Sequence, residues 1–111
     1  MKEYLFSYGT LQQTDVQHRL FGRTVSGRPD VLDGYKISAV EITDDKFLAQ
    51  GDGKIQKTLV PTGTCGDFVR GTALELTHDE LLIVDKYEPE NYKRMAIRLE
   101  SGTNAWVFIE K

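Results

Sequence analysis

Short apolar runs, separated by turn-forming residues, recur along the whole chain and limit the folds that it can adopt. Gly, Asp, Asn and Pro stand between these runs at the intervals expected of a β-rich fold, and no repeat or linker interrupts them. At 111 residues, the chain is long enough to bury a core without disulfides or a structural metal. We therefore predict one domain over residues 1–111, with a sheet that curls into a barrel and one or two short helices.

Several runs have the pattern of strands. Residues 2–7 carry consecutive apolar side chains, which is typical of a central strand buried on both faces. Residues 25–32 and 35–42 are predicted to form a hairpin, because Asp33-Gly34 suits a tight turn. Residues 69–76 alternate well enough to predict a further strand. Residues 92–99 and 104–109 should pair across a turn at 101–103, and their predicted core residues are Met95, Ile97, Leu99, Trp106 and Phe108.

The segment between residues 43 and 66 is the least patterned part of the chain. It is polar and rich in turn residues, so no strand register follows from it. Residues 57–60 are its best candidate for a strand. Asp44-Asp45 and residues 51–53 are predicted to be bends.

Two segments carry helix signals. Thr77 and Glu80 have the spacing of a capping box, which predicts a helix that starts there and ends near Tyr87, since Pro89 forces the residue before it out of helical geometry. Thr14 is a candidate cap for a shorter helix. That helix would bury a narrow apolar stripe formed by Val16, Leu20 and Phe21.

Charge and apolar content exclude several classes of function. The formal net charge is -3, with acidic and basic residues interspersed, so no basic face is available for nucleic acid or an anionic membrane. No stretch approaches the roughly 20 apolar residues of a membrane span, and the start of the chain lacks the apolar core of a signal peptide. Cys65 has no cysteine partner within the chain. We expect a cytoplasmic protein without disulfides.

Tyr8-Gly9-Thr10-Leu11 is the first candidate site motif. Glycine directly after a buried strand lets the backbone turn sharply, and successive N–H groups exposed there can form a cradle for an anion such as a carboxylate. The alternative is a plain turn that ends the strand. The motif alone does not decide between the two.

Glu88 is the second candidate, in a connection rich in carboxylates, tyrosines and bases. Pro89 holds it in extended geometry, and Tyr87 and Tyr92 flank it. Partial desolvation there would raise its pKa toward the range that a general base needs. The alternative is a solvated acidic loop in which Arg94 pairs on the outside.

Together, Tyr-Gly-Thr-Leu after the first strand and the later Asp-x-Tyr-Glu-x-x-x-Tyr-x-Arg resemble the γ-glutamylcyclotransferase-like family, including its γ-glutamylamine cyclotransferase and AIG2-like members. The resemblance runs from Tyr4 to about Arg98. It implies a small, mixed barrel of the α+β class and a cavity where the two motifs meet. It also implies an enzyme that needs no cofactor or metal and acts on a small γ-glutamyl compound, cyclising the glutamyl group to 5-oxoproline.

The resemblance also assigns roles to residues. It makes Glu88 the catalytic acid and base, and it implies that substrate is bound by Tyr8, Gly9, Thr10, Leu11, Tyr92 and Arg94. Pro89 stands where the family usually has glycine, which stiffens the loop and removes an N–H. Glu90 is a second acid nearby, but the spacing to Tyr92 favours Glu88.

Other functions remain possible from the sequence. The domain could bind a small molecule without turnover, or the acidic, aromatic loop could be a protein-binding surface with an exposed Glu88 and no cavity behind it. A nucleophilic or metal site is not indicated, because Cys65, His18 and His78 share no local signature or ligand spacing. The oligomeric state and the group on the γ-glutamyl moiety are not determined by the sequence.

Overall fold

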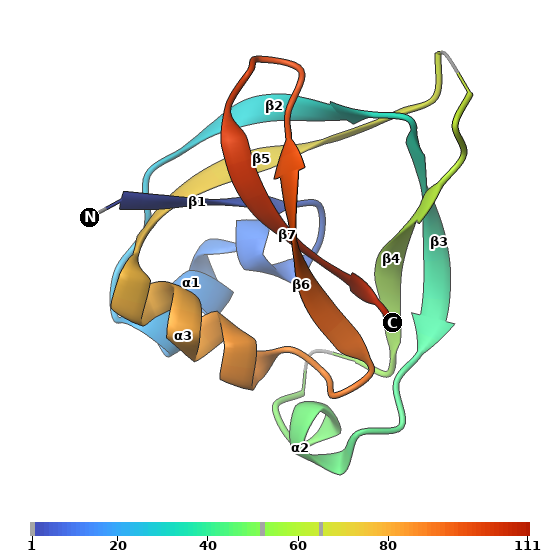
Figure 1. The fold of residues 1–111 in the computed structure, drawn as a ribbon. Coiled ribbons are helices and arrows are strands. Elements are labelled where there is room, and N and C mark those ends of the chain that lie inside the picture. The colour runs from blue at the N-terminus through green and yellow to red at the C-terminus, as the bar shows by residue number, and fades with distance from the viewer. Residues whose placement is uncertain (1, 52, 65) are drawn as a thin grey trace.

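A computed structural model describes residues 2–51, 53–64 and 66–111, and its strands form two sheets (Figure 1). The larger sheet has the order β2-β5-β1-β7-β6 and the smaller one pairs β3 with β4. The strands are β1 (Lys2–Ser7), β2 (Gly27–Asp33), β3 (Tyr35–Glu41), β4 (Ile55–Pro61), β5 (Phe68–Thr77), β6 (Tyr92–Arg98) and β7 (Asn104–Glu110). The helices are η1 (Thr10–Gln12), α1 (Thr14–Phe21), α2 (Asp45–Leu48) and α3 (His78–Tyr87).

Strand β1 lies at the centre of the larger sheet, as its apolar run predicts. It pairs antiparallel with β5 and parallel with β7. Leu5 belongs to a hydrophobic core shared with α1, α2 and α3, and Phe6 belongs to a second core that includes residues of β4 and β7. Successive side chains of a strand point to opposite faces, so β1 separates the two cores.

The predicted hairpin at Asp33-Gly34 is wrong. β2 pairs with β5, and β3 pairs with β4, so the two segments on either side of Gly34 lie in different sheets. Gly34 has a φ of 81° and marks a corner in a long bent ribbon, where its N–H bonds to the carbonyl of Asp67. The dipeptide supplied the positive φ that was expected, but the longer-range pairing with β4 and β5 took precedence over the local turn.

The closing pair of strands is confirmed. β6 and β7 run antiparallel over residues 92–98 and 104–110. Of the five predicted core residues, Leu99 and Phe108 are buried, and the other three pack partly buried against the two cores. The mixed sheet is curved but its hydrogen-bonded ladder does not close, so the predicted barrel is an open one. The α+β class is as predicted.

Helix α3 has the start and the end that its sequence predicts. The Thr77 hydroxyl accepts from the N–H of Glu80, and the Glu80 carboxylate accepts from the N–H of Thr77, which completes the capping box. In α1, Thr14 is the first helical residue and Gln13 is the N-cap, so the predicted cap is displaced by one position. Asp44 does not form a plain bend but caps α2. No helix in the described ranges is long and apolar enough to cross a membrane.

The capping box of α3 is reinforced from another part of the chain. Arg23 donates from Nε and Nη2 to the two carboxylate oxygens of Glu80, at 2.9 and 2.7 Å. The Glu80 side chain is only 12% exposed, and the Arg23 guanidinium beside it lowers the pKa of its carboxyl. This pair joins the segment after α1 to the start of α3, and both helices cover the same face of the larger sheet (Figure 1).

Replacement of Glu80 by glutamine should therefore destabilise the protein. We expect the free energy of unfolding at pH 7 to fall by about 1–2 kcal/mol, because the charged pair is lost. The pKa of Glu80 is lower in the folded state, so its contribution is present above the unfolded pKa and is lost as the pH falls through the folded one. Urea unfolding of the native protein and of Glu80→Gln should thus show a smaller difference in free energy of unfolding at pH 3 than at pH 7. The exposed Glu41→Gln is the control. An equal effect of both variants would contradict this role.

Gly71 in β5 allows a close approach that shapes the end of β1. A Cβ atom at this position would lie 2.5 Å from the carbonyl oxygen of Ser7 and 2.8 Å from the Phe6 ring. The backbone of Ser7 leads directly into the turn at Tyr8. Any side chain at position 71 would therefore push against the strand that carries this turn.

We expect Gly71→Ala to lower the free energy of unfolding by about 1–3 kcal/mol, the usual cost of overpacking. Gly9→Ala is the matched control, because a Cβ there would meet no atom within 4 Å. Thermal unfolding of both variants tests the comparison. Equal melting temperatures for the two variants would show that β1 can shift to accommodate a side chain at position 71 with no loss of stability.

Candidate functional site

The turn after β1 and the end of α3 meet at one small cavity. Its volume is about 40 Å³, which is room for a few water-sized groups. The residues around it come from the end of β1 and the turn after it, the loop after α3, helix α2, and strands β4, β6 and β7. They are Ser7, Tyr8, Gly9, Thr10, Leu11, Phe47, Gln56, Lys57, Glu88, Pro89, Tyr92 and Phe108.

Glu88 follows the last residue of α3 and lies on the wall of this cavity. Its backbone is extended, with φ −67° and ψ 148°, as Pro89 requires, and its N–H still bonds to the carbonyl of Val84. The residue keeps some exposure through the cavity, but protein atoms surround it densely. This burial raises the pKa of Glu88 to about 8. Near neutral pH, the group can therefore both accept and return a proton.

The Tyr8 hydroxyl is committed to holding the fold together. It donates to the carbonyl of Phe108 at 2.6 Å and lies 3.4 Å from the carbonyl of Lys57. The Tyr92 hydroxyl donates to the same Lys57 carbonyl at 2.8 Å. Burial raises the pKa of both tyrosines far above its usual value, so they stay protonated donors. Together they fix β4 as a wall of the cavity.

Gly9 lies where the chain leaves β1 and enters the turn. Its φ is −136°, so it does not use the left-handed conformation that favours glycine. No atom lies within 4 Å of where its Cβ would be, and the residue lines the cavity. The following residues form η1, and the first N–H groups of such a helical turn have no acceptor within it.

Sequence reasoning missed one wall of the cavity. Phe47 of α2 and the β4 residues Gln56 and Lys57 come from the segment that shows no clear pattern. Asp44 holds this wall against the loop of Glu88, because its carboxylate accepts from the N–H of Lys46 at the start of α2 and from the N–H of Glu90. The only local signal was an aspartate in a capping position before an aromatic residue.

Arg94 is not brought to the cavity. Its Nε lies 3.1 Å from the Asp85 carboxylate, and its guanidinium stacks on the Trp106 ring at 4.5 Å from the centroid. A role for Arg94 in binding substrate stays a prediction that the geometry does not favour. Glu90, the second acid, is exposed and also lies outside the cavity.

A larger, shallower groove of about 840 Å³ adjoins the cavity on the outside. The two hollows share Phe47, Glu88, Pro89 and Tyr92 as walls, and charged residues of both signs line the rest of the groove. Glu88 therefore stands where a ligand could enter the cavity with one end and extend into the groove with the other.

The histidines set aside by the sequence lie away from this site. His18 is 2.8 Å from the Thr24 hydroxyl, and His78 is 3.4 Å from the Glu3 carboxylate. Cys65 lies outside the described residues. Within the described part of the chain, no cluster of three or more His, Cys, Asp or Glu is arranged to hold a metal ion.

Comparison with solved structures identifies the fold. A protein of Arabidopsis thaliana, solved in solution, is 18% identical with a TM-score of 0.75 and is matched over 99% of this chain and 62% of its own. A second Arabidopsis thaliana protein is 22% identical with a TM-score of 0.76, over 98% of this chain and 68% of its own. A structure called gamma-glutamyl cyclotransferase is 15% identical with a TM-score of 0.74, over 100% of this chain and 68% of its own. The chain thus spans about two-thirds of the length of these proteins.

Comparison of sequences identifies the family. No curated protein sequence matches the chain. A family model described as "Gamma-glutamyl cyclotransferase, AIG2-like" matches residues 5–111, which include both motifs at the cavity. The match confirms the resemblance that the two motifs carry. The chain therefore belongs to the gamma-glutamyl cyclotransferase, AIG2-like family.

Proposed function

We propose that the protein cyclises a γ-glutamyl amine or γ-glutamyl amino acid to 5-oxoproline and releases the free amine. The α-amine of the glutamyl group attacks its own γ-carbonyl, a C–N bond forms, and the bond to the leaving nitrogen breaks. The observation that carries the proposal is that Glu88 shares one cavity with the Tyr8–Leu11 turn. Membership of the family supports the same reaction class.

Glu88 would move the proton in this reaction. The attacking amine must lose a proton from its ammonium form, and the leaving nitrogen must gain one, so a single group can perform both transfers. An ordinary glutamate is too weak a base for an ammonium. The pKa of about 8 brings Glu88 much closer to the pKa of the amine, at the cost of leaving it roughly one-tenth ionised at pH 7.

The turn would supply the binding energy and hold the reacting groups. Both reactants belong to one molecule, so the enzyme's main task is to fold that molecule into the geometry of attack. The amides of Gly9, Thr10 and Leu11 would donate either to the α-carboxylate of the substrate or to the oxyanion that develops on the γ-carbonyl. A donor to such an oxyanion is typically worth about 3 kcal/mol.

The space at the site suits a substrate bound across the two hollows. The inner cavity of about 40 Å³ accommodates only a small polar end group, whereas the outer groove of about 840 Å³ is open. A carboxylate at the turn and a leaving group in the groove would place the scissile amide near Glu88, which borders both. Small-molecule binding without turnover is the alternative function for the same site.

Replacement of Glu88 by glutamine tests the proposed role directly. We expect Glu88→Gln to lower kcat for 5-oxoproline release by about 100- to 10,000-fold, the usual range for a lost general acid and base. Chromatographic detection of 5-oxoproline from a panel of γ-glutamyl compounds measures it, with Glu41→Gln as the control, because Glu41 is exposed and lines neither hollow. Undiminished turnover by a folded Glu88→Gln variant would remove this residue from the mechanism. Binding of a panel member without product by the native protein would favour the binding module.

The raised pKa of Glu88 also predicts two pH dependences. Because the ionised form is the base, kcat/KM should rise with pH and level off near pH 8, whereas an ordinary glutamate would level off near pH 4.5. Between pH 4.5 and pH 8, the Glu88 carboxyl holds a proton in the folded protein but not in the unfolded chain. The contribution of Glu88 to stability therefore decreases as the pH rises through this range.

Glu88→Gln should therefore gain stability relative to the native protein between pH 5 and pH 8, by an amount on the order of a few kcal/mol. Denaturant unfolding of both proteins at several pH values measures this without any substrate. If the free energies of unfolding of the two proteins differ by the same amount from pH 5 to pH 8, the Glu88 carboxyl is well hydrated in the folded state.

A further inference from the structure

A hydrogen bond joins the two halves of the site. The Thr10 hydroxyl lies 3.1 Å from the hydroxyl of Tyr87, so the turn after β1 is connected to the last residue of α3. Glu88 is the next residue along the chain. Neither motif predicts this contact, because the two residues are 77 positions apart in the sequence.

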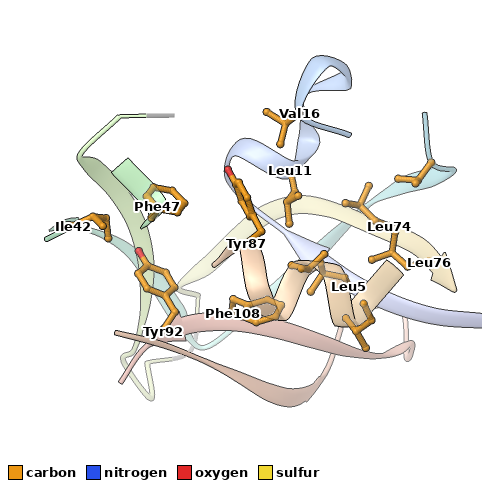
Figure 2. Packing of buried hydrophobic residues seen from close by; sticks show 13 residues of the cluster. Leu5, Leu11, Val16, Ile42, Phe47, Leu74, Leu76, Tyr87, Tyr92 and Phe108 are labelled. Carbon is orange, nitrogen blue, oxygen red and sulfur yellow. The ribbon is translucent and has the colours of Figure 1, made fainter. Parts of the chain in front are cut away.

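Tyr87 is held firmly enough for this bond to matter. Its side chain is 4% exposed, and its ring lies 5.4 Å from the ring of Phe47, between centroids. The guanidinium of Arg19 lies 5.9 Å from the centroid of the Tyr87 ring. Figure 2 shows the ring between Phe47 and Leu11, with its hydroxyl directed toward the turn.

The end of α3 is anchored on a second side by another contact. Asp85, two residues before Tyr87, pairs with Arg94 of β6, which stacks on Trp106 of β7. This contact fixes the helix to the sheet but does not reach the turn. The bond between Thr10 and Tyr87, in contrast, links the turn to the residue that precedes Glu88.

We infer that Tyr87 is a positioning residue, whose hydroxyl, through Thr10, holds the Glu88 carboxyl in the cavity beside the Tyr8–Leu11 turn. The effect of Tyr87 on turnover rests on the proposed function. The placement of the Glu88 carboxyl by Tyr87 does not depend on that function. Tyr87 also borders the outer groove. A shift of about 1 Å in a reacting group costs much of the rate, so the Tyr87 hydroxyl can control catalysis through its bond to Thr10.

Three variants isolate this bond. Tyr87→Phe and Thr10→Val each remove one hydroxyl at nearly constant volume, whereas Thr10→Ser keeps the hydroxyl and should keep the native titration of the Glu88 carboxyl. Tyr4→Phe is the matched control, since Tyr4 is partly buried outside the cavity. In each protein, the titration of the Glu88 carboxyl is followed by ¹³C NMR, and kcat and KM for 5-oxoproline release are measured well below the melting temperature.

We expect Tyr87→Phe and Thr10→Val to lower kcat at least tenfold, with a smaller change in KM. The Glu88 titration should shift downward by at least one pH unit, because a looser carboxyl gains water. The double variant should resemble either single one, since both remove the same bond. A native titration midpoint and native kcat in Tyr87→Phe would overturn the inference, even if its melting temperature falls.

The NMR titration separates this inference from the proposed function. If the native protein releases no 5-oxoproline, the reaction is wrong, but the Glu88 titration still reports whether the bond places the carboxyl. A downward shift in Tyr87→Phe and Thr10→Val, absent in Thr10→Ser and Tyr4→Phe, would support the placement. An unchanged midpoint in all four would refute it.

Discussion

The pairing of β1 between an antiparallel and a parallel neighbour is the constraint on which the rest of the structure depends. β5 and β7 approach the chain from distant parts of the sequence and enclose β1, so its apolar residues can be buried on both faces. One face packs against the helices and the other against the bent ribbon. Because β1 is fixed on both sides, the turn that follows it is delivered to a defined place at the border of the two cores.

Tyrosine hydroxyls then connect this turn to the rest of the site. Tyr8 and Tyr92 donate to backbone carbonyls and attach β4 as a wall, while Tyr87 reaches the hydroxyl of Thr10. A buried phenol contributes a large apolar ring and one polar atom that needs a partner, which makes its orientation specific. The three residues thus combine core packing with the positioning of a polar cavity.

The same packing places Glu88 in an unfavourable environment. Burial destabilises the ionised form and raises the pKa of Glu88 to about 8. Glu80 shows the opposite case on the same helix, because Arg23 lowers the pKa of its carboxyl. One glutamate at the start of α3 stabilises the fold in its charged form, and the other, just after the end of α3, is kept largely neutral by the fold. Perturbed acids of the second kind are concentrated at functional sites.

The sequence by itself determined the features that depend on local chemistry. The capping box at Thr77 and Glu80, the helix end before Pro89, the central apolar strand and the closing pair of strands were all predictable, because neighbouring residues decide them. The two motifs also identified the family. Only the tertiary structure decided the pairing around Gly34, the wall formed by Phe47 and Lys57, the location of Arg94 beside Trp106, and the bond between Thr10 and Tyr87. Each of these joins segments far apart in the chain, and such contacts form only when burial of the two cores brings those segments together.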